Sequence, residues 1–230
     1  MKKRSIALLL LLALLTGCGA KKEEAPWQTA YRETGKYLQE QDTLSAGSVG
    51  GEWAVIGLSR AGLLSDEAAQ SYEQAAEDYV KQADSGRLDR LKSTENSRTI
   101  LGLTAAGYNA ADVAGVDLTS GLSDMNYLRI QGLNGPIWAL IALDCHGYDI
   151  PQCAEGGEQT TRAGLVAEIL TSQCSDGGWT LAGDTADVDM SAMALTALAA
   201  YKEDDEVKAA VDAALVYLSD AQQEDGGFIS

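Results

Sequence analysis

The sequence predicts an all-α fold made of repeated pairs of helices, in which an apolar inner helix is followed by a more polar outer helix. Three observations support this fold class. The 230 residues include 35 alanines, the residue with the highest helix propensity, and only 3 prolines. An apolar segment recurs along the chain at a spacing typical of repeated supersecondary units. The alternation of β-branched residues that marks strands is missing, and aromatic residues make up only 6% of the chain.

Four apolar segments are the predicted inner helices, at residues 54–62, 99–107, 138–147 and 193–201. Each is apolar around nearly its whole circumference, which is typical of a helix buried on several sides. The first three end in Gly62, Gly107 and Gly147, which are 45 and 40 residues apart. Because glycine readily adopts the left-handed conformation just past a helix end, we expect each helix to stop there.

Amphipathic segments between the apolar ones are the predicted outer helices, at residues 31–41, 65–82, 159–172 and 206–223. The second begins with Ser65, Asp66 and Glu67, a capping residue followed by acidic side chains that favour a helix N-terminus. Residues 108–133 are rich in loop-forming residues, and we expect one short helix there, over 119–130. The result is about four hairpins and a leading helix, with the inner helices packed together and shielded from water by the outer ones.

The N-terminus has the pattern of a bacterial lipoprotein signal. A basic start at residues 2–4 precedes ten apolar residues at 6–15, which are too few for a bilayer span of roughly 20 residues but enough for a signal-peptide core. The following Leu15-Thr16-Gly17-Cys18 resembles a lipobox, in which the cysteine is lipidated. We therefore expect three parts: a signal peptide at 1–17, a lipidated Cys18 with its tether at 18–26, and a folded domain at 27–230. The lipid would anchor this domain to the bacterial membrane, outside the cytoplasm.

The net charge of −17 argues against a nucleic-acid partner, because the chain has no basic patch beyond residues 2–4. An extracytoplasmic location permits disulfides. Cys145 and Cys153 flank a short loop and could pair, which would leave Cys174 as a buried thiol or an intermolecular partner; other pairings stay open. No two cysteines have the C-x-x-C spacing, so the sequence predicts no zinc site of that kind.

Two segments, 169–179 and 218–228, share the pattern Ile/Leu-x3-Gln-x3-Gly-x-aromatic and end in Trp179 and Phe228. This pattern resembles the QW repeat of triterpene cyclases and the matching repeat of protein prenyltransferase β subunits. The resemblance implies an α/α toroid for residues 27–230. Because Ser230 follows directly on the second copy, where another inner helix would be expected, we expect the ring to be incomplete.

The segment 187–195 resembles two signatures within that superfamily. In squalene-hopene-type cyclases, a similar acidic segment protonates the substrate, which would make Asp189 the general acid with Asp187 beside it. The same segment is similar to that of intrinsic factor and transcobalamin, which share the toroid and bind cobalamin without catalysis. A third, structural interpretation is that Asp189 caps the inner helix. The zinc site of prenyltransferases is disfavoured, because position 191 is Ser and the single histidine, His146, lies upstream.

The resemblance also suggests which side chains would contact a ligand at the mouth of the ring. Gln131 and Asn134 stand just before the third inner helix, although a simple Gly-Pro turn also explains their segment. The full set of candidate ligand-binding residues is Gln131, Asn134, Trp138, Trp179, Asp187 and Asp189.

Three functions remain as hypotheses from the sequence. The first is a non-catalytic lipoprotein that binds a corrinoid or another hydrophobic small molecule, with no catalytic cofactor and no metal. The second is a terpene cyclase-like enzyme with Asp189 as general acid. The third is a structural or adhesive module that holds a protein partner at the bacterial surface.

Overall fold

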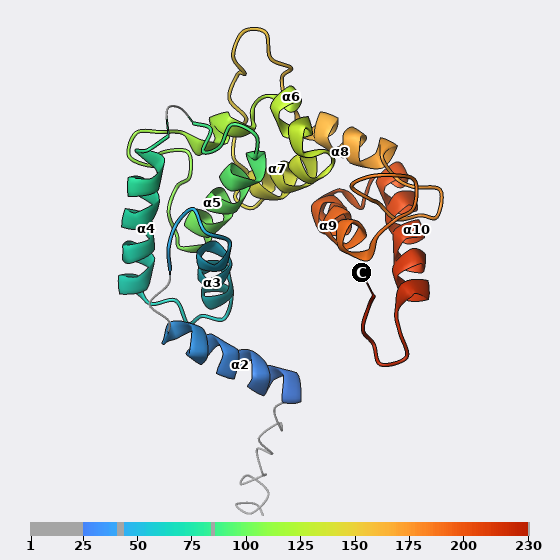
Figure 1. The fold of residues 1–230 in the computed structure, drawn as a ribbon, viewed down its shortest axis with the longest axis horizontal. Helices are drawn as coiled ribbons and strands as arrows, with labels where there is room; N and C mark the ends of the chain where they lie inside the picture. Colours follow the sequence, from blue (N-terminus) through green and yellow to red (C-terminus); the bar gives the residue numbers. More distant parts are fainter. Residues whose placement is uncertain (1–24, 41–43, 84–85, 230) are drawn as a thin grey trace, which may run out of the picture.

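The computed structural model describes residues 25–40, 44–83 and 86–229, and within these ranges it contains nine α-helices and no strand (Figure 1). The all-α prediction is therefore confirmed. The predicted signal peptide, Cys18 and most of its tether lie outside the described residues.

The helices alternate along the chain as the sequence predicts. The leading helix is α2 (Pro26–Gln39). The inner helices are α3 (Val49–Arg60), α5 (Ser93–Ala105), α7 (Asn134–Asp144) and α9 (Val188–Leu198). The outer helices are α4 (Asp66–Val80), α8 (Arg162–Thr171) and α10 (Asp205–Ala221). The loop-rich region holds only the short α6 (Met125–Leu128), between the 3-10 turns η1 (Leu118–Leu122) and η2 (Arg129–Gln131), and a third turn, η3 (Ala199–Tyr201), follows α9.

Glycines end the first three inner helices as predicted. Gly62, Gly107 and Gly147 have φ angles of 67°, 90° and 67°, in the left-handed region that side chains disfavour. After each glycine the chain turns back, and a backbone N–H bonds to a carbonyl five residues earlier, as from Leu63 to Leu58 and from Tyr108 to Leu103. This bonding pattern satisfies carbonyls that a helix end leaves without partners.

The inner helices pack against one another in chain order, α3 on α5, α5 on α7 and α7 on α9, and form an arc (Figure 1). They run parallel. Near its start α5 bonds to α3 through Arg98 and Glu52, and near its end the Ser59 hydroxyl donates to the Ala105 carbonyl. On the outside, α8 packs on α7 and α10 on α9, in each case the inner helix that precedes it. The outer helix α4 packs instead on α5, the inner helix that follows it.

In three inner helices the fourth residue is polar and buried. Its side chain accepts a hydrogen bond from the loop that leads into the helix. Glu52 of α3 accepts a bond of 2.6 Å from the Gly47 N–H. Asn96 of α5 accepts one of 2.9 Å from Leu88, and Ser191 of α9 accepts one of 2.9 Å from Trp179. All three side chains are fully buried, and these bonds compensate their burial. The inner helices begin before the predicted apolar segments because these polar residues belong to their first turns.

Candidate functional site

Two tryptophans from non-adjacent inner helices meet on the exposed side of the arc. The rings of Trp53, on α3, and Trp138, on α7, have centroids 5.4 Å apart and an interplanar angle of 60°. Because α5 packs between α3 and α7, the ring contact bridges across α5. Trp53 remains 41% exposed and Trp138 is half-buried. A partly exposed aromatic pair offers apolar area at a small cost in conformational entropy, which suits ligand contact.

Asn134 lies one helical turn before Trp138 on α7. Its side-chain oxygen is buried and has no hydrogen-bond partner among the described residues. A buried acceptor without a donor is costly, by roughly 1–3 kcal/mol. A donor on a bound molecule would remove that cost once the Asn134 side chain turned towards the surface.

A buried ionic network lies at the same end of α3 and α5. The Arg98 Nε donates to Glu52 Oε2 at 3.1 Å, and its two terminal nitrogens bond to both oxygens of Glu95. Burial raises the pKa of Glu52 above its usual value, against the opposing effects of Arg98 and the Gly47 N–H. Because Arg98 is bound on both sides by carboxylates, it acts as a clamp between two helices.

The hydroxyl of Tyr72, on α4, is buried and without a partner among the described residues. Burial, with the nearby charge of Glu52, raises the pKa of this phenol far above its ordinary range. Tyr72 is therefore held in its neutral, protonated form.

Two of the sequence-predicted ligand residues have structural roles. Gln131 accepts from the Thr94 N–H at 3.0 Å and donates to the Thr94 hydroxyl at 3.1 Å, so it closes the N-terminus of α5. Trp179 is fully buried, and its indole N–H donates to the Ile169 carbonyl at 2.7 Å. Neither side chain lies on the surface with Trp53 and Trp138.

The two aspartates of the acidic segment divide into a cap and an exposed side chain. Asp187 is the N-cap of α9, and its carboxylate accepts from the Met190 N–H at 2.7 Å. The interpretation that Asp189 caps this helix is therefore wrong, because Asp189 already lies in the first turn. Asp189 is exposed to solvent, whereas proton transfer to an alkene requires a site from which water is excluded.

Within the described ranges, no group of three or more His, Cys, Asp or Glu side chains is placed to hold a metal ion. Cys145, Cys153 and Cys174 are all free thiols, so the structure contains no Cys145–Cys153 disulfide. None of the described helices is both long and apolar enough to cross a lipid bilayer.

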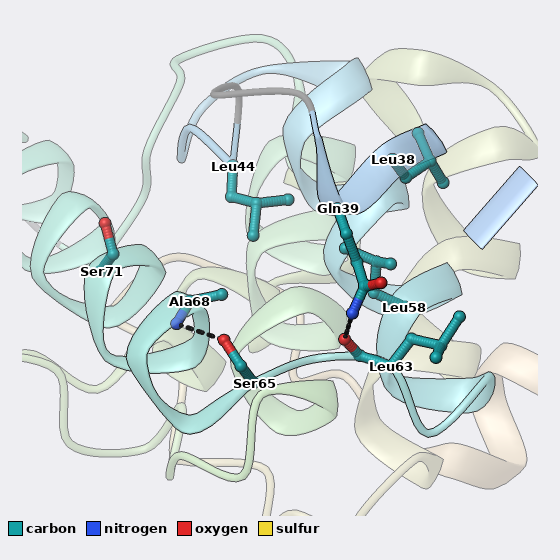
Figure 2. A pocket seen from close by; sticks show the side chains of 8 residues that line it. All are labelled: Leu38, Gln39, Leu44, Leu58, Leu63, Ser65, Ala68 and Ser71. Carbon is teal, nitrogen blue, oxygen red and sulfur yellow. Dashed lines mark hydrogen bonds between the residues drawn. The ribbon is translucent and has the colours of Figure 1, made fainter. Parts of the chain in front are cut away.

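A pocket of about 360 Å³ lies where α2 meets α3 and α4, and neither tryptophan of the pair lines it (Figure 2). Gln39 reaches across from α2 to the Leu63 carbonyl at 2.5 Å, and Ser65 caps α4 through the Ala68 N–H at 3.2 Å. The residues that line it are Leu38, Gln39, Leu44, Leu58, Leu63, Ser65, Ala68 and Ser71. None of these side chains carries a charge, and the bonds within the pocket serve helix docking and capping.

The face formed by Trp53, Trp138 and Asn134, which we name the inner-helix face, is thus the candidate site. The Arg98 clamp lies on the other side of the inner helices, towards Tyr72 and Tyr79 of α4. Of the residues of the inner-helix face, the sequence analysis identified Trp138 and Asn134 but missed Trp53. One signal in the sequence could have identified Trp53: it is the fifth residue of its inner helix, as Trp138 is of another.

Comparisons with protein-family models, with curated proteins and with solved structures gave no match for this chain.

Proposed function

We propose that this protein is a membrane-anchored, extracytoplasmic lipoprotein with an α/α toroid, whose inner-helix face binds a hydrophobic small molecule without transforming it. The observation that carries this proposal is the partly exposed Trp53–Trp138 pair at 5.4 Å, held by two inner helices with a third between them. The parallel packing of four inner helices in chain order supports the toroid. The lipobox around Cys18 supports the anchor.

The chemistry of the face indicates the class of ligand. The tryptophan pair favours a molecule with an extended apolar or ring surface. The unpaired oxygen of Asn134, one turn before Trp138, would accept from an amide or a hydroxyl of a ligand if the side chain turned towards that surface. A corrinoid, whose flat ring system carries peripheral amides, meets both requirements and is the first ligand to test.

A binding role accounts for the described residues better than acid catalysis does. A cyclase-like reaction requires a buried proton donor, and Asp189 is exposed. Two further carboxylates of the inner helices, Glu52 and Glu95, are both held by Arg98. These charges stabilise the packing of two helices and leave no paired acid and base facing the tryptophans.

Isothermal titration calorimetry tests the proposal. The described helices begin at Pro26, so a soluble chain lacking residues 1–18 keeps every one of them. The ligands are cyanocobalamin, cobinamide, farnesol and an anilinonaphthalene sulfonate. We expect saturable binding of at least one of them, weakened about tenfold or more, or about 1.4 kcal/mol, by Trp53→Ala.

The matched control is Trp27→Ala, which removes an exposed tryptophan from α2 rather than from the inner-helix face. This variant should bind as tightly as the unmodified chain. The proposal would be overturned if none of the four ligands gave saturable heat, or if Trp53→Ala and Trp27→Ala bound with equal Kd.

A further inference from the structure

The helix α2 begins close to the predicted lipidation site. Its first residue, Pro26, stands eight positions after Cys18. An extended chain spans at most about 3.6 Å per residue, so α2 begins no more than about 30 Å from the residue that would carry the lipid. A lipid at Cys18 would therefore bring the side chains that α2 exposes close to the headgroups of the bilayer.

Only a small part of α2 packs on the rest of the molecule, at the end of the arc beyond α3 (Figure 1). Within α2, which the structure describes in full, Gly35 alone is buried, and a side chain there would collide with Leu63. The two aromatic residues in the N-terminal half of the helix face solvent, since Trp27 is 67% and Tyr31 49% exposed. This half of α2 thus presents its rings to the outside of the molecule.

Trp27, Tyr31 and Arg32 lie on one side of α2, where they line a groove of about 350 Å³ together with Ala61 and Leu63. Tryptophan and tyrosine each have an apolar ring and a polar group, and in membrane proteins they concentrate at the level of the lipid headgroups. A guanidinium binds the phosphates of those headgroups. The three side chains that share this groove therefore match the chemistry of a lipid–water interface.

The charge of α2 also differs from that of the other helices. The chain has a net charge of −17, and α4 and α10 each carry a surplus of acidic side chains. Among the α-helices of the described ranges, only α2 has more basic than acidic side chains, with Arg32 and Lys36 against Glu33. An anionic lipid surface would therefore attract this helix and repel the acidic remainder of the molecule.

We propose that Trp27, Tyr31 and Arg32, which we name the α2 face, dock on the lipid headgroups of the bilayer. This inference rests on the lipid anchor at Cys18 in the proposed function, and it adds a second contact between the domain and the same membrane. The two rings enter the headgroup region, and Arg32 lies among the phosphates. Because α2 packs on α3, this contact also orients the folded domain on the bilayer.

Lipids with acyl chains brominated near the headgroup quench nearby tryptophan fluorescence and so test the contact. In the probe chain a hexahistidine segment replaces residues 1–18 and tethers the protein to vesicles of phosphatidylethanolamine, phosphatidylglycerol and a nickel-chelating lipid. Two sets of vesicles differ only in bromine. We expect the brominated vesicles to quench the probe chain, and the quenching to be lost in Trp27→Phe. The matched control is Trp53→Phe, at an exposed position on α3, which should keep the quenching.

A second pair of variants distinguishes docking from mere closeness to the tether, because both keep Trp27 as the reporter. Tyr31→Ser removes a ring that lines the groove, whereas Tyr37→Ser removes an exposed ring of the same helix that does not line it. Both positions are exposed, so neither change should unfold the domain, which circular dichroism melting checks. We expect weaker quenching in Tyr31→Ser than in Tyr37→Ser.

The proposal is overturned if brominated lipid does not quench the probe chain, if Trp53→Phe loses the quenching that Trp27→Phe keeps, or if Tyr31→Ser and Tyr37→Ser are quenched equally. The second result would place the inner-helix face on the bilayer. Palmitate labelling of the full chain, with Cys18→Ser as its control, tests the anchor separately. Since the tether replaces the lipid, quenching without labelling contradicts the anchor, whereas labelling without quenching contradicts only the α2 face.

Discussion

Arg98 on α5 donates its Nε–H to the fully buried carboxylate of Glu52 on α3, across 3.1 Å. The two residues are 46 positions apart in the chain, and each occupies the N-terminal half of its helix. This ion pair fixes the register of the first two inner helices and so places Trp53 beside α5.

Removing the arginine should destabilise the fold strongly. Arg98→Met leaves the Glu52 carboxylate buried with only the Gly47 N–H as a donor, and breaking a buried pair in this way costs about 3–5 kcal/mol. Adding Glu52→Gln should recover most of the loss, because no buried charge then remains. Urea unfolding of the two variants measures both effects; equal stability of single and double variants would contradict the explanation.

The buried carboxyl of Glu52 should also make the stability of the Arg98→Met variant depend on pH. Burial raises the folded-state pKa of Glu52 above its ordinary value of 4.5, so the native chain holds the proton more tightly than the unfolded chain. This stabilising contribution is fully present below pH 4.5 and is lost as the pH rises through the folded-state pKa. Without Arg98 the pKa rises further, so urea midpoints measured against pH should show the variant approaching the unmodified chain on acidification.

Asp124 should show the opposite pH dependence. Its carboxylate bonds to Arg87 at 2.9 Å and accepts the Asn126 and Glu158 N–H groups, both at 3.1 Å. Partial burial alone would raise its pKa, but these bonds outweigh that effect and lower it. Asp124→Ala should cost about 1–2 kcal/mol at pH 7, and the difference should vanish as the pH falls through the lowered folded-state pKa. Thermal melting from pH 7 to pH 3 checks this, and a difference that grew on acidification would exclude it.

The two aspartates at the start of α9 are two residues apart, but removing each of them should have a different effect on the stability of the fold. Asp187→Ala removes the N-cap bond to Met190 and should cost about 1 kcal/mol. Asp189→Ala removes an exposed side chain and should change the free energy of unfolding by less than about 0.5 kcal/mol. Chemical denaturation compares them directly. A larger cost at Asp189 would show a buried partner for that carboxylate.

Trp179 and Phe228 occupy equivalent positions in two copies of one sequence pattern, so replacing each by alanine gives a matched pair of stability measurements. Trp179→Ala should cost about 3–5 kcal/mol, because it empties a fully buried site and leaves the Ile169 carbonyl with only the weaker bond from the Ser172 N–H. Phe228→Ala, at the equivalent but exposed position, should cost less than about 1 kcal/mol in the isolated chain. Differential scanning calorimetry of both variants measures the contrast, and similar losses would mean that Phe228 is covered in solution.

Local patterns in the sequence determined the helical class, the alternation of inner and outer helices, and the glycines at 62, 107 and 147 that end them. Those features depend on residues within one or two turns of each other, and so their spacing is sufficient to predict them. The starts of the inner helices were predicted too late, because Glu52 and Asn96 are polar and their burial depends on partners from another helix or loop. Apolar patterning cannot detect a polar group that becomes buried through such a bond.

Only the tertiary structure decided which of the candidate side chains meet. It joined Trp138 to Trp53, 85 residues earlier, and it separated Asp189 at the surface from Asp187 at the helix cap. It also made Trp179 a buried structural residue while leaving the equivalent Phe228 exposed. The physical reason is that burial and ring contacts depend on which helices pack side by side, whereas propensity and capping depend only on the neighbouring chain.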